Sequence, residues 1–554
     1  MSDLASFIYG PEAGPHLADR IRQLLAEREA RFRNSAPMPF SQRDALLITY
    51  ADMLSGGGET KPIDRLAAFL SGHARGLFTY VHLLPFFPYS SDDGFSVVDY
   101  RAVDGRIGDW AGIGRLGARF KLAFDLVLNH GSVRSEWFKA FLEGKPPYAS
   151  WYLTRPEGYD ASKVFRPRTH PLLTPFTRPD GSIVQVWTTF SADQADFDFG
   201  NPEVLLEFVR VLLDYAGRGA RLLRLDAIAY LWKEDGTACL HHPKTHAAVK
   251  LLRSVVDALG LDLVILTETN VPHEENLSYF GDGDEARMVY NFALPPLLLH
   301  AAVSGDAGPL RRWVASLPPA GSGPVFLNFT ASHDGIGVSP VRGLVDAAAF
   351  AKTIAETERR GGKVSFKSTT VGQVPYELNC VYLDAVAPPD ADDRTRARAF
   401  LATQAAMLAL AGLPAVYFHS WIGSGNWTEG PALLGHKRAI NREKPEIAAL
   451  EADLADPSSL RAAVHAGFRR LLEYRSERAA FSPEISQRVL PAEGAVFALV
   501  RGPDARGVSV LCAHNLGARS ASLRLPADFG AGRLDLEPWE TRWMASSNGG
   551  ELCI

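Results

Sequence analysis

The stretch Arg221-Leu-Leu-Arg-Leu-Asp-Ala-Ile-Ala-Tyr230 places two opposite charges inside a run of apolar residues. The leucines predict a buried β-strand, and Arg224 and Asp226 interrupt the run at the carboxyl end of that strand. Buried charges are normally paired, so one explanation is an ion pair that only locks two elements together. The other is a carboxylate held ionised by its arginine at the mouth of a barrel. The choice depends on whether other strand ends carry similar groups.

Seven further apolar runs have the length and character of buried strands. They are Ala45–Tyr50, Val81–Leu84, Lys121–Leu128, Leu263–Leu266, Met288–Tyr290, Val325–Leu327 and Ala415–Phe418. Helical patterns separate most of these runs, for example at 202–216, 246–259 and 395–410. Eight strands alternating with helices predict an α/β fold, a closed (β/α)8 TIM barrel. A doubly wound sheet would need a glycine-rich phosphate turn after its first strand, and Ser55-Gly-Gly-Gly58 is only a weak match.

The remaining segments predict additions to the barrel. Apolar residues at helical spacing over 16–35 predict an N-terminal helix. Two gaps between strands are too long for plain loops and predict inserted subdomains after the third and seventh strands. Short alternating strands after Phe481 predict a separate antiparallel β domain. We therefore expect a helical extension (1–44), barrel segments (45–130, 201–334, 394–480), two inserts (131–200, 335–393) and a C-terminal β domain (481–554).

Composition excludes several kinds of partner. The chain has 554 residues, 46% hydrophobic and 22% charged, which is typical of globular proteins. Its formal net charge of -5 shows no basic excess, so we expect neither nucleic acid nor a membrane surface as a partner. No signal segment or long apolar run is present, which predicts a cytoplasmic protein. The four cysteines lack metal-ligand spacing, so we expect free thiols, no metal and no cofactor; a monomer and a homodimer both stay open.

Acidic residues and histidines follow four of the predicted strands. The groups are Asp125–His130, Asp226, Glu268 and Ser332–Asp334. In a (β/α)8 barrel the carboxyl ends of the strands form one face, so these side chains should converge there. A lone carboxylate at a strand end is usually a cap or an ion-pair partner. Three carboxylates and two histidines on one rim instead favour a catalytic site.

Glycosyl transfer is chemistry that needs several carboxylates without a metal. A retaining enzyme uses one ionised carboxylate as nucleophile and one protonated carboxyl as acid, about 5–5.5 Å apart. Arg224 lies two residues before Asp226 and therefore on the same side of the strand, where it should keep the pKa of that aspartate low. Burial and the nearby negative charge should raise the pKa of Glu268. The environment would thus divide the two roles.

The four clusters resemble, in order and spacing, the signature regions of the α-amylase superfamily, glycoside hydrolase family 13. Other stretches are similar to its sucrose phosphorylase branch. They are His82–Pro88, Ser91–Ser96, Gly236–Cys239, Pro243–Thr245, Asn291–His300, His333–Val338 and Tyr376–Asn379. The resemblance implies a retaining phosphorylase that uses inorganic phosphate to release α-glucose 1-phosphate from an α-glucoside. Asp226 would be the nucleophile, Glu268 the acid/base and Asp334 the transition-state stabiliser.

The resemblance also implies a glucose subsite. It would consist of Asp92 at its closed end, Phe95 as an aromatic platform, and His130, Arg224 and His333. Arg442 would be a further substrate-binding residue. Histidines can donate hydrogen bonds to sugar hydroxyls, and an aromatic face can cover the apolar side of a pyranose. Ordinary core packing remains the alternative for Phe95.

The acceptor side departs from sucrose phosphorylases. Those enzymes carry an aspartate and a glutamine near the tyrosine equivalent to Tyr376, whereas Val374 and Glu377 stand here. The departure favours glucosylglycerate as substrate, with glucosylglycerol, sucrose and sucrose 6'-phosphate as alternatives. Tyr376 and Glu377 would contact the acceptor, and Arg166 and Arg168 would bind glycerate or phosphate through charge-assisted bonds or else lie on the surface.

Two further classes of function remain open. An α-glucosidase-type hydrolase would share every catalytic residue, and only its acceptor would differ. A non-catalytic carbohydrate-binding protein is expected to have lost at least one of Asp226, Glu268 and Asp334, but all three are present.

Overall fold

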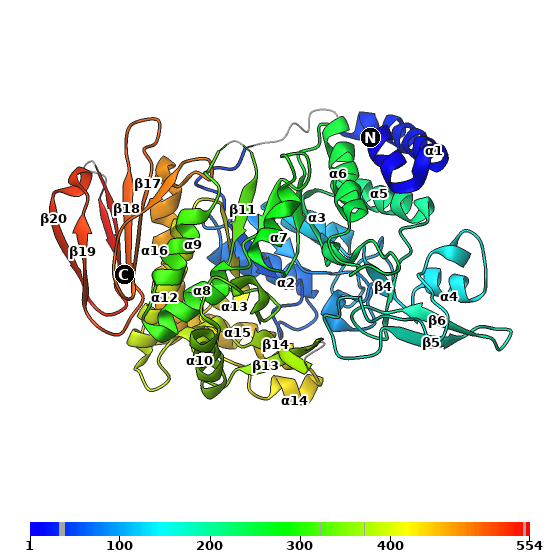
Figure 1. Cartoon of the computed structure of the whole chain (residues 1–554). Coiled ribbons are helices and arrows are strands. Elements are labelled where there is room, and N and C mark those ends of the chain that lie inside the picture. Colours follow the sequence, from blue (N-terminus) through cyan, green and yellow to red (C-terminus); the bar gives the residue numbers. More distant parts are fainter. Residues whose placement is uncertain (33–38, 322, 370–371, 547–549) are drawn as a thin grey trace.

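The computed structural model describes residues 1–32, 39–321, 323–369, 372–546 and 550–554. Eight parallel strands form its centre. In chain order they are β1 (Leu46–Thr49), β2 (Tyr80–Leu83), β3 (Lys121–Leu126), β8 (Ala220–Leu225), β9 (Val264–Thr267), β10 (Met288–Tyr290), β11 (Val325–Asn328) and β15 (Leu413–Tyr417). They close into a barrel in the order β1-β15-β11-β10-β9-β8-β3-β2 (Figure 1). Each predicted strand is present, and the (β/α)8 barrel is confirmed.

Strand pairing brings the charged strand ends to one rim. Parallel pairing of β3 with β8 places Asp125 opposite Arg224, and pairing of β8 with β9 places Arg224 opposite Leu266. Asp226 and Glu268 follow directly after β8 and β9. Because parallel strands end at the same edge, residues far apart in the sequence become neighbours there.

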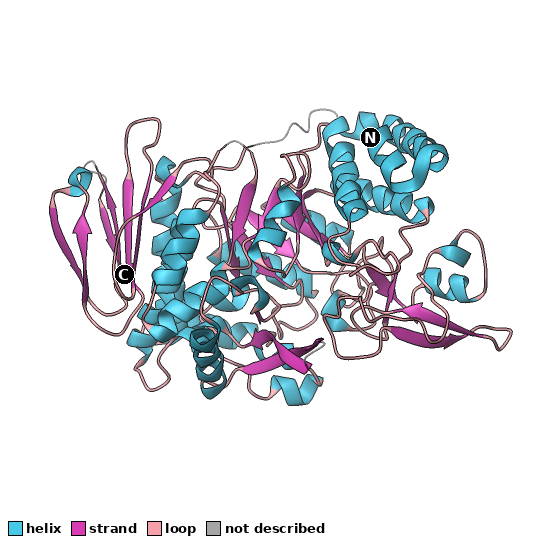
Figure 2. Cartoon of the chain, in the orientation of Figure 1, coloured by secondary structure: helices cyan, strands magenta, loops and turns pink. Residues whose placement is uncertain are grey.

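Helices surround the barrel (Figure 2). The longer ones that follow the strands are α2 (Pro62–His73), α3 (Trp110–Gly117), α5 (Pro202–Gly217), α6 (Pro243–Ala258), α8 (Leu294–Ser304), α9 (Gly308–Ser316), α12 (Asp393–Ala409), α15 (Ile447–Ala455) and α16 (Leu460–Ser476). The shorter ones are α7 (His273–Leu277), α13 (Phe418–Trp421) and α14 (Gly430–Leu434). Local signals fix several starts: the side chains of Asn201 and Asp392 accept backbone N–H groups at the first turns of α5 and α12.

The N-terminal helix α1 (Ser2–Phe32) packs on α5 and α6. It begins earlier than the predicted 16–35 and changes direction at Gly10, whose φ of 86° favours glycine. Residues 33–35 of that prediction lie outside the described residues. Leu17 and Ile21 are buried as the pattern predicted, and Arg20 pairs with Glu203 at the edge of the contact.

The two long gaps hold structure of their own. The first contains α4 (Glu136–Leu142), the pair β4 (His130–Ser132) and β7 (Gln194–Asp196), and the hairpin β5 (Leu173–Thr177) and β6 (Ile183–Trp187). The second contains β12 (Ile336–Gly337), α10 (Ala347–Arg359), β13 (Lys363–Thr369), β14 (Gly372–Asn379) and α11 (Tyr382–Val386). Lys233 ties the first gap segment to the barrel, since its Nζ lies 2.6 Å from Asp196 Oδ2 and 2.7 Å from Asn129 Oδ1.

An antiparallel sheet at the C-terminal end confirms the predicted change of fold class. It has the order β16 (Gln487–Val489), β17 (Val496–Arg501), β18 (Val510–Asn515), β21 (Thr541–Ala545) and β22 (Glu551–Cys553). A hairpin of β19 (Ala521–Leu525) and β20 (Gly532–Leu536) accompanies it. Figure 1 shows this region, in orange and red, beside α12 and α16.

Two buried arginines bind backbone carbonyl groups near the floor of the barrel, where the strands begin, and one of them, Arg501, belongs to this sheet. Arg475 of α16 donates to the carbonyl oxygens of Gln42, Asp44, Gly412 and Phe481. Arg501 of β17 donates to those of Ala409, Ser482 and Ile485. We call Arg475 and Arg501 the floor arginines.

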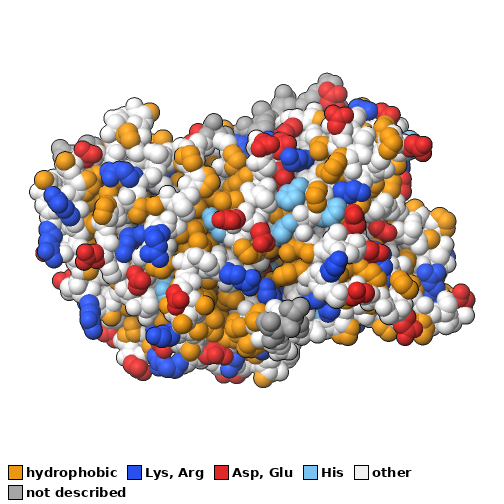
Figure 3. Space-filling view, viewed as in Figure 1, with side chains coloured by type: hydrophobic (Ala, Val, Ile, Leu, Met, Phe, Trp, Pro, Cys, Tyr) orange, Lys and Arg blue, Asp and Glu red, His pale blue; other side chains and the backbone are white. Residues whose placement is uncertain are grey.

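The surface and the cysteines carry few special features. On the face in Figure 3, positive and negative side chains are interspersed, with no large area of one sign. Within the described ranges, no helix has the length and apolar character needed to cross a bilayer. The cysteines form no disulfide, and the described residues contain no cluster of three or more His, Cys, Asp or Glu placed to hold a metal ion.

Candidate active site

A pocket opens at the carboxyl ends of the barrel strands, and Asp226, Glu268 and Asp334 all line it. Asp226 and Glu268 follow β8 and β9, and Asp334 lies in the loop after β11. Seven other predicted residues line the same pocket. They are Asp92, Phe95, His130, Arg168, Arg224, His333 and Tyr376. The structure thus brings together side chains that are up to 284 positions apart, from Asp92 to Tyr376.

Arg224 is the centre of the charge network below the pocket. Its side chain is 3% exposed, and Nη1 lies 2.6 Å from Asp125 Oδ1 and 2.7 Å from Asp226 Oδ1. His82 Nε2 lies 2.9 Å from the other Asp125 oxygen. Asp226 is therefore held from below by a guanidinium that is itself fixed by a second, fully buried carboxylate.

Glu268 is held by the turn that follows β8. The backbone N–H of Ala227 donates to Glu268 Oε2 at 3.0 Å. Ala227 has a φ of 50°, in the left-handed region that residues with a Cβ seldom adopt. This conformation turns the chain just after Asp226 and directs the N–H group of Ala227 toward Glu268, at the end of β9.

Burial controls protonation in this cluster. Burial raises the pKa of Asp226 well above its ordinary value, against the opposing effect of Arg224. The expectation that Arg224 keeps the pKa of Asp226 low is therefore wrong for the substrate-free site, because desolvation outweighs one ion pair. Burial also raises the pKa of Glu268, with Asp334 adding to the effect, in the direction predicted.

Neighbouring carboxyls of this kind titrate as a group. Arg224 Nη1 donates directly to Asp226, whereas its nearest approach to Glu268 is 3.9 Å. This contact favours ionisation of Asp226 over that of Glu268, while burial opposes ionisation of both. A nucleophile and an acid require such a difference.

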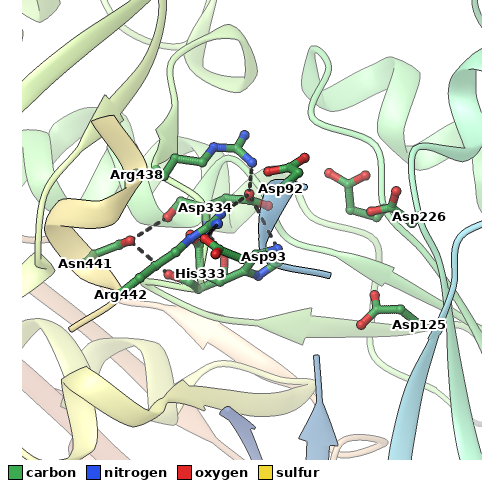
Figure 4. Close-up of polar contacts among 12 residues, drawn as sticks. Asp92, Asp93, Asp125, Asp226, His333, Asp334, Arg438, Asn441 and Arg442 are labelled. Atoms are coloured by element: carbon green, nitrogen blue, oxygen red, sulfur yellow. Dashed lines mark hydrogen bonds and ion pairs between the residues drawn. The ribbon is translucent and has the colours of Figure 1, made fainter. Parts of the chain in front are cut away.

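Two arginines from the loop after β15 surround Asp334. Arg438 Nη1 contacts Asp334 Oδ1, and Arg442 Nη2 lies 3.8 Å from the same oxygen. Figure 4 shows Arg438 directed at Asp334. Burial opposes ionisation of Asp334, but the arginines prevail and lower its pKa.

Arg442 lies behind the pocket wall and does not line the pocket. Its Nε donates to the carbonyl oxygen of His333 at 2.8 Å, and Nη1 lies 2.5 Å from Asp93 Oδ2. Asn441 Nδ2 donates to the carbonyl oxygen of Asp334 at 3.0 Å (Figure 4). These bonds fix the backbone that carries His333 and Asp334.

The ring of Phe95 is stacked on His333, with centroids 4.8 Å apart and planes 2° from parallel. One face of Phe95 is therefore occupied within the protein, while the ring still lines the pocket. His130 Nε2 lies 3.1 Å from the carbonyl oxygen of Phe95, and burial lowers the pKa of His130, which favours its neutral form.

Several lining residues were not predicted from the sequence, among them Phe190, Gln194 and Arg438. Gln194 Nε2 lies 3.3 Å from Asp92 Oδ2 and 3.1 Å from His130 Nε2, so it links two predicted residues. Phe190 and Gln194 lie in the first insert, and Arg438 lies 21 residues beyond the end of β15, so the strand-end pattern could not select them. An available signal was that Gln194 lies near the end of the first insert, 32 residues before Asp226.

The outer part of the pocket carries Tyr376 and Arg168. The Arg168 guanidinium carbon lies 5.6 Å from the centroid of Tyr376 and 5.7 Å from that of Phe190. Arg166 does not line the pocket, and its Nη2 contacts the carbonyl oxygen of His170. Glu377 does not line it either, because its carboxylate is bonded to Arg438.

The barrel with acidic residues at its strand ends matches a known class. Residues 76–307 match the family model of the α-amylase catalytic domain. The structure superposes on sucrose 6F-phosphate phosphorylase of Thermoanaerobacter thermosaccharolyticum with a TM-score of 0.78, covering 94% of this chain and 99% of that one at 23% identity. That likeness concerns the fold.

Similarity in sequence extends further. The glucosylglycerate phosphorylase of Spirochaeta thermophila is 48% identical over 523 residues, which cover 93% of this chain and 89% of that protein. The glucosylglycerate phosphorylase of Escherichia coli is 38% identical over 559 residues, 98% of this chain and 99% of that protein. The chain belongs to the α-amylase family, glycoside hydrolase family 13, in the branch that contains these phosphorylases.

Proposed function

We propose that the protein is a retaining phosphorylase that cleaves glucosylglycerate with inorganic phosphate to α-D-glucose 1-phosphate and glycerate, reversibly. The observation that carries the proposal is the convergence of Asp226, Glu268 and Asp334 in one pocket. Two relatives with the name glucosylglycerate phosphorylase, 48% and 38% identical, support this choice of substrate. The chemistry needs no cofactor or metal ion.

In the first step, Asp226 attacks the anomeric carbon while Glu268 protonates the departing glycerate oxygen. The direct hydrogen bond from Arg224 to Asp226 supports the ionised nucleophile. The raised pKa of Glu268 supports a protonated acid near neutral pH.

In the second step, a phosphate oxygen attacks the glucosyl–enzyme bond and Glu268 takes up the proton of the incoming nucleophile. Two inversions restore the α configuration, so the product is α-glucose 1-phosphate. Water in place of phosphate would give glucose, and access of water to the intermediate therefore sets the ratio of phosphorolysis to hydrolysis.

The glucosyl unit would occupy the inner part of the pocket. Asp334 and His333 are placed to bind hydroxyl groups on one side, and Asp92 and His130 on the other. Hydrogen bonds of this kind stabilise the transition state when they strengthen as positive charge develops on the sugar ring. Arg442 would act from behind by fixing the backbone of His333.

The acceptor would occupy the outer part, beside Tyr376. Both glycerate and phosphate are anions, and Arg168 lines this part of the pocket without a carboxylate partner among the described residues. A guanidinium can bind either anion through two parallel hydrogen bonds. One cationic subsite would then serve both directions of the reaction.

The test is acceptor selection with α-glucose 1-phosphate as donor. Glycerate, glycerol, fructose and fructose 6-phosphate are compared by phosphate release and product analysis. We expect glycerate to give the highest kcat/KM. Preference for fructose or fructose 6-phosphate would reject the glycerate assignment, and glucose as the main product with every acceptor would indicate a hydrolase.

A further inference from the structure

Glu377 is buried beside the pocket and has both carboxylate oxygens engaged. Oε1 accepts from Arg438 Nε at 2.9 Å and from the backbone N–H of Gly335 at 2.8 Å. Oε2 accepts from Arg438 Nη2 at 2.7 Å. Its side chain is 3% exposed. Glu377 therefore cannot act on a ligand directly, and any effect on substrate choice passes through Arg438.

Arg438 bridges three parts of the molecule. It belongs to the loop after β15, it is paired through two bonds with Glu377 of β14, and its Nη1 contacts Asp334 after β11. A guanidinium has five N–H donors, and Glu377 uses two of them. Asp334 engages Nη1, which leaves at most two N–H groups for a ligand. Arg438 lines the pocket and is 21% exposed, so a ligand can reach this side of the guanidinium.

Charge balance explains why a fixed cation is needed there. Asp92, Asp226, Glu268 and Asp334 all line the pocket, and an anionic acceptor must come close to them. Arg224 cannot compensate at the acceptor side, because it is 3% exposed and directed at Asp125 and Asp226. Among the described residues that line the pocket, Arg168 and Arg438 are the remaining cations.

Arg168 and Arg438 differ in how firmly they are held. The hydrogen bond found for the Arg168 guanidinium is a 3.4 Å contact with the carbonyl oxygen of Pro167, whereas Arg438 has a two-point bond to a buried carboxylate. A preorganised guanidinium loses less freedom on binding an anion than a mobile one. Selectivity for an acid over a neutral polyol should therefore depend strongly on Arg438.

We propose that Glu377 is a specificity-determining positioning residue: it holds the Arg438 guanidinium between Asp334 and the acceptor, where Arg438 binds the carboxylate of an acid acceptor. The inference rests on the proposed function and adds the residue pair that selects the acid. A purely structural tie between β14 and the loop after β15 is the competing explanation.

The experiment compares two acceptors that differ only in the carboxylate, glycerate and glycerol. α-Glucosyl fluoride serves as donor, so that phosphate is absent. Glu377→Gln keeps the side-chain shape and one oxygen for the Gly335 N–H group but loses the two-point ion pair. We expect KM for glycerate to rise about tenfold, the effect of one weakened charge-assisted hydrogen bond. KM for glycerol should change less than about twofold.

A matched control comes from the same insert. Glu356 is paired with Arg359 and Arg360, both Nε distances being 2.7 Å, but does not line the pocket. Glu356→Gln should therefore keep the wild-type ratio of the two KM values. Glu377→Asp retains the charge with a shorter reach, and we expect an intermediate ratio.

The outcomes separate the two hypotheses. A parallel rise in both KM values, or an unchanged ratio in the Glu377 variants, overturns the positioning role. If Glu377→Gln does not fold, Glu377→Asp decides, and a wild-type ratio there overturns the proposal as well. If the wild-type protein itself uses glycerol as well as glycerate, the proposed function fails at its acceptor, whatever the variants do.

Discussion

Buried arginines at the two ends of the barrel have different partners. At the mouth, Arg224, Arg438 and Arg442 each contact at least one carboxylate. At the floor, Arg475 and Arg501 donate to backbone carbonyl oxygens. The pKa values of these arginines differ as well. At the floor, burial lowers the pKa of Arg475 to about 9 and that of Arg501 to about 10. At the mouth, nearby acids outweigh burial and raise the pKa of Arg438.

The contrast distinguishes two uses of a buried charge. At the floor, each guanidinium satisfies several backbone carbonyl groups at once, so its role is structural. At the mouth, guanidinium groups oppose the effect of burial, and they lower the pKa of Asp334 and Glu377. Substitutions at the mouth should therefore change activity, and those at the floor should change stability while activity stays the same.

The largest effect is expected at the mouth. Asp226→Asn removes the proposed nucleophile beside Arg224 and should lower turnover on the order of 10⁴-fold or more. The change removes a charge whose burial is unfavourable, so the fold should persist. Release of α-glucose 1-phosphate and a thermal unfolding curve are the measurements. A near-wild-type rate would mean that another residue forms the covalent bond.

At the floor, Arg475→Met should destabilise the protein without changing its chemistry. Carbonyl oxygens that Arg475 now satisfies would lose their donor in a buried place, at a cost of about 3 kcal/mol or more. We expect a clear fall in the unfolding temperature and an unchanged kcat/KM below it. Arg470→Met, at an exposed site on the same helix, is the control. Loss of activity at a temperature where the variant is folded would contradict a purely structural role of Arg475.

Arg168→Ala tests the outer part of the pocket. Losing a charge-assisted bond to a partly buried anion should weaken phosphate and glycerate together, by about 1.5–3 kcal/mol. Initial rates in both directions give the two KM values. Arg178→Ala, which removes a cation near the Phe141 ring in the same insert, is a matched control. Unchanged phosphate kinetics would show that Arg168 is not the anion ligand.

Two glutamates at the mouth should change stability in opposite directions. Burial raises the pKa of Glu268 in the folded protein. The protonated side chain therefore contributes stability at acidic pH, and this contribution is lost as the pH rises through the pKa of the folded state. The pKa of Glu377 is lowered because Arg438 outweighs burial, so its contribution is present at neutral pH and lost as pH falls. At pH 7.5, Glu268→Gln should raise the free energy of unfolding and Glu377→Gln should lower it, each by about 1 kcal/mol.

Unfolding curves at acidic and neutral pH measure both variants. The difference between each variant and the wild-type protein should shrink toward acidic pH, where the carboxyls are protonated. If both variants changed the free energy of unfolding in the same direction at neutral pH, the opposite pKa shifts of Glu268 and Glu377 would be contradicted.

The smallest effect is expected on the outer surface. Arg20 and Glu203 join α1 to α5 with side chains 33% and 36% exposed. Arg20→Ala should lower the free energy of unfolding by less than about 1 kcal/mol, and added salt should reduce the difference. A loss greater than about 2 kcal/mol would show that the ion pair, rather than the apolar face of α1, holds the helix in place.

The barrel could be predicted because each strand is buried on both sides and reads as a continuous apolar run. The three carboxylates could be predicted because they follow such runs. Phe190 and Gln194 could not, since their positions depend on how the first insert folds back over the rim. Arg438 could not, since it lies 21 residues beyond the end of β15.

Protonation was harder to predict than position. The spacing of Arg224 and Asp226 correctly indicated an ion pair, which the structure shows at 2.7 Å. The sequence does not reveal the degree of burial, and burial decides the direction of the Asp226 pKa. Gly10 and two prolines concealed the early start of α1, because such residues normally end a helix.

Lys233 shows how the pocket wall is held without dependence on the surrounding solution. Its ammonium group joins Asp196 of the first insert to Asn129, the residue before His130. A free cation in this place would come and go with its concentration in the medium. A cation attached to the chain has a fixed, high effective concentration at the site. The position of His130 is therefore set by the chain itself, and dilution or a change of ion supply does not release it.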